Sequence, residues 1–120
     1  MLTSILGETA LSSEPDVVDE HRRRLAAAPP AGIAWAQRAM AARSSRFEAL
    51  EDLEVPGLVV RGGEDALSSQ DDAEAMATAI RANGGDAELV MIPNAGHMTA
   101  TEDPSATAEV LAAFWRRCTR

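Results

Sequence analysis

The hydrophobic positions in residues 1–54 recur every three or four residues, which is the spacing of amphipathic helices. Prolines mark the boundaries, because Pro15 suits a first helical turn and Pro29-Pro30 ends that helix before another begins. We therefore predict helices over residues 15–27 and 30–42, and a short helix near residues 47–50. Their apolar faces consist of Val18, His21 and Leu25, of Ile33, Ala36 and Met40, and of Phe47 and Leu50.

The pattern changes after Val55-Pro56, where short apolar runs alternate with helical segments. The runs Leu58–Val60, which glycines flank, and Glu88–Ile92, which Pro93 ends, predict two buried strands. A helix over residues 70–82 is expected between them, because Ser69 can cap it and Asp72 is placed for a capping box. Its apolar face consists of Ala73, Met76, Ala77 and Ile80, and Asn83-Gly84-Gly85 ends it.

A last helix is expected after Asp103, with Pro104 in its first turn. Its apolar face consists of Thr107, Val110, Leu111 and Phe114. The order after Pro56 is then strand, helix, strand, helix, which predicts two parallel strands joined by a crossover helix. The expected fold class is α/β, with a helical segment over residues 1–54 and a β-α-β-α unit over residues 55–120.

The composition limits the class of protein and its partners. The chain has 120 residues, of which 46% are hydrophobic and 25% are charged, and its net charge is −8. These are the values of a soluble globular domain, and an acidic surface repels nucleic acid and anionic membranes. No apolar run approaches the roughly 18 residues of a membrane span, and the first ten residues do not resemble a signal peptide. A cytoplasmic location is therefore expected, with no nucleic acid and no membrane as partner.

Other chemistry-bearing residues predict no metal and no cofactor. Cys118 is the single cysteine, and the two histidines are distant from it in the sequence, so neither a disulfide nor a structural zinc site is expected. No phosphate-binding glycine loop is present. The basic run Arg22-Arg23-Arg24 is interpreted as a solvated helix face, and His21 beside it as a packing residue.

Two loops follow the predicted strands and carry the candidate chemistry. Gly62-Gly63-Glu64-Asp65 follows the first strand, and Asn94-Ala95-Gly96-His97 follows the second. Each loop alone also fits an ordinary turn or a packing histidine. Parallel neighbours, however, bring both loops to one edge of the sheet, where a carboxylate can orient an imidazole and stabilise its protonated form. We expect Asp65 and His97 to lie within hydrogen-bonding reach of each other.

The segments VPGLVVRGGEDALSS and AELVMIPNAGHMTATEDPSATAEVLAAFW resemble the C-terminal part of α/β-hydrolase-fold enzymes of the esterase and lactonase type. The resemblance implies that Asp65 is the acid of a catalytic triad and that His97 is its general base. It also implies that residues 1–54 include a helical cap, so that Trp35, Met40 and Met98 are candidates to line a substrate pocket, with core packing as the alternative. The reaction implied is hydrolysis of a carboxylic ester or lactone.

One departure from the family pattern bears directly on activity. The nucleophile of such enzymes sits in a Gly-x-Ser-x-Gly motif, and no serine of this chain has glycines at those positions. The oxyanion donors and the earlier strands of the family sheet are also missing, so we expect the chain alone to be inactive. A small ester or lactone is the expected substrate if the N-terminal half of the fold is supplied. The alternative is a non-catalytic binding module. Because the first strand would keep an open edge, self-association or a partner chain is also expected.

Overall fold

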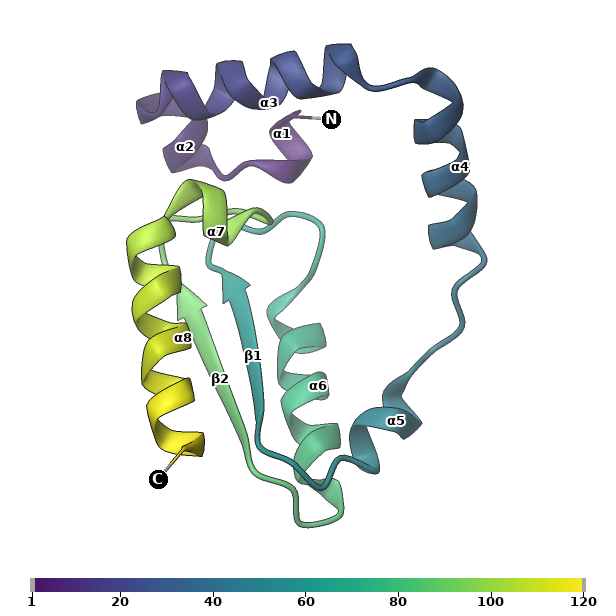
Figure 1. Cartoon of the computed structure of the whole chain (residues 1–120), viewed down its shortest axis with the longest axis vertical. Coiled ribbons are helices and arrows are strands. Elements are labelled where there is room, and N and C mark those ends of the chain that lie inside the picture. Colours follow the sequence, from purple (N-terminus) through teal and green to yellow (C-terminus); the bar gives the residue numbers. More distant parts are fainter. Residues whose placement is uncertain (1, 120) are drawn as a thin grey trace.

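The computed structural model describes residues 2–119 and combines helices with a two-stranded parallel sheet (Figure 1). The α/β fold class predicted from the sequence is confirmed. The elements in chain order are α1 (Leu2–Ile5), α2 (Glu8–Ser13), α3 (Pro15–Ala27), α4 (Pro30–Ala41), α5 (Phe47–Glu51), β1 (Gly57–Gly62), α6 (Gln70–Ala82), β2 (Ala87–Ile92), α7 (Thr99–Glu102) and α8 (Pro104–Cys118).

The main helices begin at the proline and capping residues from which the sequence predicts their starts. Helices α3, α4 and α8 all have proline in their first turn. The capping box of α6 is complete, because Ser69 Oγ accepts the Asp72 N–H at 3.0 Å and the Asp72 carboxylate accepts the Ser69 N–H at 3.0 Å. Asp103 caps α8 by accepting the Ala106 N–H at 2.9 Å. These bonds satisfy amide groups that the first turn of a helix leaves without partners.

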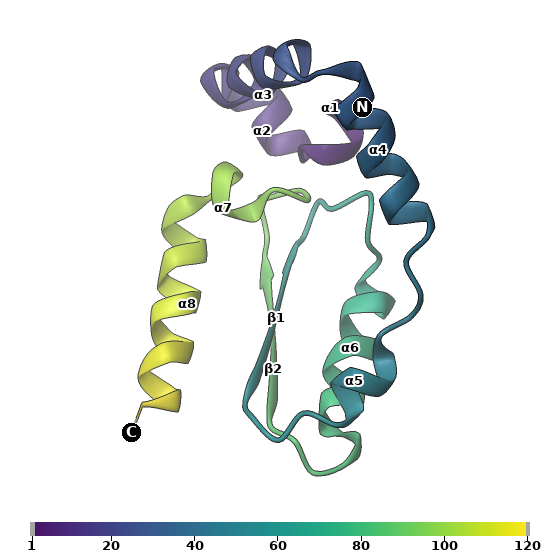
Figure 2. The ribbon, with the colours of Figure 1, turned by 45° about the vertical axis from the view of Figure 1, so that its right-hand side comes forward.

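The two strands run parallel and in register from Gly57 opposite Ala87 to Gly62 opposite Ile92. Each strand extends slightly beyond the predicted apolar run. Helices α5 and α6 lie on one side of the sheet and α8 lies on the other, as Figure 2 shows with the sheet seen nearly edge-on. The sheet is therefore covered on both faces, as expected for parallel strands.

The core lies between the sheet and α6. It is built from Val59 and Ala87 on the strands and from Ala73, Ala77 and Ile80 on the helix, with Leu50, Leu53, Met76 and Leu89 packed around them. Gly57 lies directly against Ile80, so that the helix approaches the strand closely. The predicted apolar face of α6 is confirmed by this packing.

Three predicted apolar positions are exposed, and one of them is Phe47 on α5, at 41%. Met40 is 52% exposed, although it was expected on a buried stripe, because α4 stands apart from the sheet (Figure 1). Leu111 is 53% exposed, because α8 contacts the sheet through a narrower face on which Thr107 is buried. Helical periodicity identifies an apolar face, but it does not say how much of that face a neighbouring element covers.

Helices α1, α2 and α3 lie across the carboxyl ends of the strands (Figure 1). The hydrophobic pattern did not predict α1, α2 or α7. They have four to six residues each, too few to be stable from local propensity alone. Long-range bonds hold this region instead, since the Gly7 N–H donates to Glu102 at 2.7 Å and the Thr9 N–H donates to Glu64 at 2.8 Å. Within residues 2–119, no helix is long and apolar enough to cross a membrane.

Candidate active site

The candidate site is formed by the two loops that follow β1 and β2. Because Gly62 and Ile92 are register partners at the strand ends, the chain leaves both strands at the same edge. Backbone bonds continue the pairing into the loops, with Gly63 N–H donating to Ile92 O at 2.7 Å and Glu64 N–H donating to Ala95 O at 2.9 Å. The parallel topology therefore places the Asp65 loop directly against the His97 loop.

The close approach of these loops depends on glycine. A Cβ atom added at Gly62 would overlap the carbonyl oxygens of Ala95 and Gly96, and one added at Gly96 would overlap the backbone of Leu6 and Gly7. Both positions therefore require a residue without a side chain. The same two glycines allow three segments of backbone to meet at one point: the two strand-end loops and the N-terminal segment.

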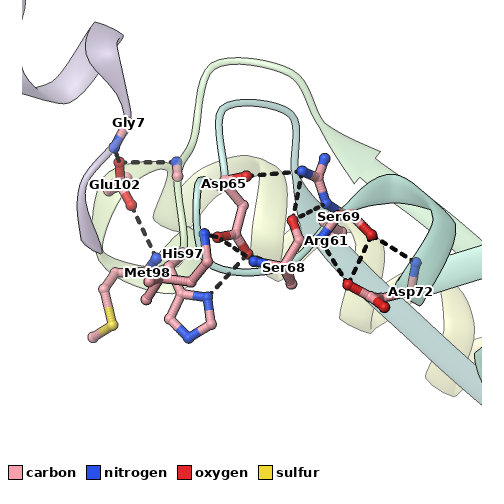
Figure 3. A network of polar contacts seen from close by, with 11 residues as sticks. Gly7, Arg61, Asp65, Ser68, Ser69, Asp72, His97, Met98 and Glu102 are labelled. Atoms are coloured by element: carbon pink, nitrogen blue, oxygen red, sulfur yellow. Dashed lines mark hydrogen bonds and ion pairs between the residues drawn. The ribbon is translucent and has the colours of Figure 1, made fainter. Parts of the chain in front are cut away.

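Asp65 and His97 meet at this edge, as the strand-end argument predicts. The Asp65 Oδ2 atom lies 2.9 Å from the His97 Nδ1 atom (Figure 3). Only 5% of the Asp65 side chain is exposed, whereas 46% of the His97 side chain is accessible to solvent. With a carboxylate as its partner, Nδ1 is assigned as the protonated nitrogen, which leaves Nε2 as the atom that can accept a proton.

Hydrogen bonds fix the Asp65 carboxylate from several directions. Its Oδ1 atom accepts the Leu67 N–H at 2.8 Å and the Ser68 N–H at 3.2 Å, while Oδ2 also accepts the Ser68 hydroxyl at 2.5 Å. Burial by itself raises the pKa of Asp65, but the bonds from Ser68, His97 and Leu67 outweigh burial and lower the pKa to about 2. Asp65 is therefore ionised at neutral pH and oriented toward the imidazole.

Arg61 fastens the acid loop to the end of β1. Its guanidinium donates to the carbonyl oxygen of Asp65 at 2.9 Å and to that of Ser68 at 2.8 and 3.0 Å (Figure 3). One planar group thereby holds both ends of the turn that carries the carboxylate. Neither Arg61 nor Ser68 is among the site residues that the sequence predicts. The available signal was an arginine at the end of an otherwise apolar strand, four residues before the candidate acid.

A hollow of about 340 Å³ opens beside His97 and is mostly apolar. Two of the three predicted substrate-lining residues, Met40 and Met98, line it. Trp35 is 67% exposed and is not among the residues that line this hollow. The remaining lining residues are Ser4, Ile5, Gln37, Leu67 and His97 itself. Residues 4 and 5 were not predicted, because only the docking of the N-terminal segment brings them here.

The other singled-out residues lie away from this edge or serve packing. His21 is buried, and its Nδ1 atom lies 3.0 Å from the Val17 carbonyl oxygen within α3. The side chains of residues 22–24 pair with Asp19 and Glu20 on the surface of the same helix. Cys118 is exposed at the end of α8. Residues 2–119 contain no cluster of three acidic, histidine or cysteine side chains that could hold a metal ion.

The parallel strands covered by helices, with an Asp–His pair at their carboxyl ends, define the class as the α/β-hydrolase fold. Residues 26–120 match the dienelactone hydrolase family, and the chain belongs to that family. Comparison with curated proteins found no match.

Solved structures that are similar to this chain include an esterase and Est816. One is a thermophilic esterase from Thermogutta terrifontis with malate bound, which is 31% identical, has a TM-score of 0.88, and is matched over 98% of this chain and 42% of the esterase. The other is Est816, described as an N-acyl homoserine lactone degrading enzyme, at 20% identity and a TM-score of 0.71 over 94% of this chain and 44% of Est816. The chain spans less than half the length of either protein.

Proposed function

We propose that this chain supplies the acid and the histidine of a serine-hydrolase triad for carboxylic ester or lactone hydrolysis. Asp65 is the orienting acid and His97 is the general base. The observation that carries the proposal is the 2.9 Å contact between Asp65 Oδ2 and His97 Nδ1 at the carboxyl ends of two parallel strands. The similarity to an esterase and to a lactone-degrading enzyme supports the same reaction class.

In this reaction His97 Nε2 takes the proton of a serine hydroxyl as the serine oxygen attacks the carbonyl carbon of the ester. The protonated ring then gives that proton to the departing alcohol oxygen, which leaves an acyl-serine. Water attacks this acyl-serine with the same ring as the base, and the ring returns the proton to the serine oxygen as the acid is released. Asp65 stabilises the positive imidazolium through both steps. Because the chain has no Gly-x-Ser-x-Gly motif, the serine and the oxyanion donors come from a complementary part of the fold.

The surface of the chain supports a role for such a complementary part. Within residues 2–119, β1 pairs with β2 alone, so each strand has one edge with unpaired backbone groups. Large apolar side chains are also exposed, including Leu111 at 53% and Trp115 at 69% on α8. We propose that earlier strands of a hydrolase sheet, or a second copy of this chain, cover these surfaces. A small uncharged ester or lactone would then enter the hollow lined by Met40 and Met98.

A chimera tests the proposal. The matched 42% of the Thermogutta terrifontis esterase is replaced by residues 1–120 of this chain, and hydrolysis of a p-nitrophenyl ester is measured. We expect turnover that falls by about 10³-fold or more on His97→Ala and by a comparable factor on Asp65→Asn. His21→Ala is the matched control, because His21 is the chain's other histidine and lies in α3 away from the Asp65–His97 pair.

Two outcomes would contradict the proposal. A folded, monodisperse chimera without ester hydrolysis would do so, and so would turnover that His97→Ala leaves unchanged. Either result would favour the alternative of a non-catalytic binding module that shares the shape of the hydrolase sheet.

A further inference from the structure

The Glu102 carboxylate accepts three backbone hydrogen bonds beside the candidate site (Figure 3). Its Oε2 atom accepts the Gly7 N–H at 2.7 Å and the Gly96 N–H at 2.9 Å, and its Oε1 atom accepts the Met98 N–H at 2.9 Å. Charged acceptors form bonds about twice as strong as neutral ones. Three such bonds to one half-buried side chain hold the backbone of the three donor residues in place.

Two of these bonds flank His97 in the sequence. Gly96 and Met98 are its immediate neighbours, and both of their amide groups point at Glu102. The amide group of His97 itself donates to the Ile5 carbonyl oxygen at 2.9 Å. All three consecutive N–H groups of this turn are therefore paired, and one carboxylate holds the backbone on both sides of the imidazole.

We propose that Glu102 is a positioning residue for His97, which holds the backbone of residues 96–98 so that the imidazole meets Asp65. The importance of Glu102 for catalysis rests on the proposed function. Its effect on the orientation of the His97 ring does not. Glu102 touches neither Asp65 nor the imidazole in the network of Figure 3, so its effect is transmitted through the backbone.

A carboxylate is the group that this arrangement requires. Its two oxygens offer about four acceptor sites and no donor, which matches three converging N–H groups. A glutamine side chain offers a single acceptor oxygen, and its amide nitrogen would face at least one backbone N–H. Glu102→Gln keeps nearly the same shape, but it cannot accept all three backbone hydrogen bonds.

Glu64 provides a matched control for the second task of Glu102, which is to hold the N-terminal segment. The Glu64 carboxylate accepts the Thr9 N–H at 2.8 Å and the Thr9 hydroxyl at 2.6 Å, and it bonds to no residue of the His97 turn. Glu64→Gln weakens the docking of α2 and leaves residues 96–98 untouched. Glu109→Gln, at an exposed position on α8, controls for the loss of one charge.

The experiment is nuclear magnetic resonance on the full chain and its variants. Ring ¹⁵N shifts of His97, at a pH where the ring is neutral, report which nitrogen carries the proton, and amide exchange reports the backbone bonds. In Glu102→Gln we expect His97 to change from the Nδ1–H form to the mixed forms of a free imidazole. We also expect exchange at Gly96 and Met98 to accelerate by about tenfold or more. Glu64→Gln should accelerate exchange at Thr9 and leave the ring unchanged, and Glu109→Gln should change neither.

Two results would overturn the proposal. One is a Glu102→Gln protein whose His97 ring shifts match those of the unchanged chain. The other is a Glu64→Gln protein that alters the ring as much as Glu102→Gln does, because docking of α2 would then be the cause. If Glu102→Gln does not fold, exchange in the unchanged chain decides. Protected amides at both Gly96 and Met98 support the proposal, and free exchange at either contradicts it.

Discussion

Replacing Asp65 with asparagine tests whether the carboxylate is held in its ionised form by the site. Asparagine keeps one acceptor oxygen for the Leu67 and Ser68 amide groups, which Oδ1 of Asp65 now accepts. It places an NH₂ group where Oδ2 accepts from the Ser68 hydroxyl and His97 Nδ1. Two donors would then face that NH₂ group, so the ring must turn or change its tautomer, and the Ser68 hydroxyl must rotate away.

The size of the effect follows from the pKa of Asp65. That pKa falls from an ordinary value of 3.8 to about 2 in the folded chain, and at 1.36 kcal/mol for each pKa unit the difference corresponds to roughly 2 kcal/mol before screening by solvent. His97 is half exposed and solvent screens its share, so we expect Asp65→Asn to lower the free energy of unfolding by about 1–2 kcal/mol at neutral pH. Because the folded pKa lies below the unfolded one, this stabilisation is present above pH 3.8 and is lost as the pH falls through about 2.

Urea unfolding of both proteins, repeated from neutral to acidic pH, measures this difference. The gap between them should stay constant down to about pH 5 and then close as acid protonates Asp65. Titration of the Asp65 carboxyl ¹³C shift measures the pKa directly. A gap that is unchanged at about pH 3, or a carboxyl pKa at or above the ordinary 3.8, would refute the reasoning.

Four further predictions follow from the geometry. Ser69→Ala should cost about 1 kcal/mol of stability in thermal or urea unfolding, because the capping box of α6 is lost; an unchanged midpoint would contradict this. Gly62→Ala should cost about 1–3 kcal/mol or more through backbone overlap, whereas Gly32→Ala, with open space around it in α4, should stabilise by about 0.5–1 kcal/mol. The isolated chain should hydrolyse a p-nitrophenyl ester no faster than its His97→Ala variant, since the chain lacks the serine motif; labelling of a serine by a fluorophosphonate would contradict that expectation. Light scattering should detect self-association through the open sheet edges, and a monomer at high micromolar concentration with strongly protected strand amides would argue against it.

The features that the sequence predicts correctly all carry local signals. Pro15 and Pro104 define the starts of α3 and α8, and Ser69 with Asp72 defines the start of α6. The proximity of Asp65 and His97 also follows from local information, because strand-helix-strand order implies parallel pairing and a shared edge. Proline, capping residues and hydrophobic periodicity affect only the residues within a few positions of themselves. Their structural consequences can therefore be predicted without knowledge of the tertiary structure.

The features that escaped prediction depend on contacts between distant residues. Helix α2 has no side-chain cap of its own, and its first turn is completed by Glu64 and Glu102, at sequence separations of 55 and 95 residues. Arg61 is an exception, because its partners Asp65 and Ser68 lie only four and seven residues away, and its role arises from the turn after β1 that folds back over it. Trp35 is 67% exposed on α4, and helical periodicity does not specify the direction in which α4 leaves α3.

The bond between Gly7 and Glu102 also orders events during synthesis of the chain. The donor is made 95 residues before its acceptor, and at about 5–20 residues per second the acceptor follows roughly 5–19 seconds later. Until then, the segment at residues 2–13 cannot dock on the strand ends, and Leu6 and Ala10, which the finished fold buries, remain accessible on the nascent chain. Residues 2–13 are thus synthesised before the rest of the described range but are among the last of it to reach their final place, and a chaperone that binds short apolar stretches would meet them during that interval.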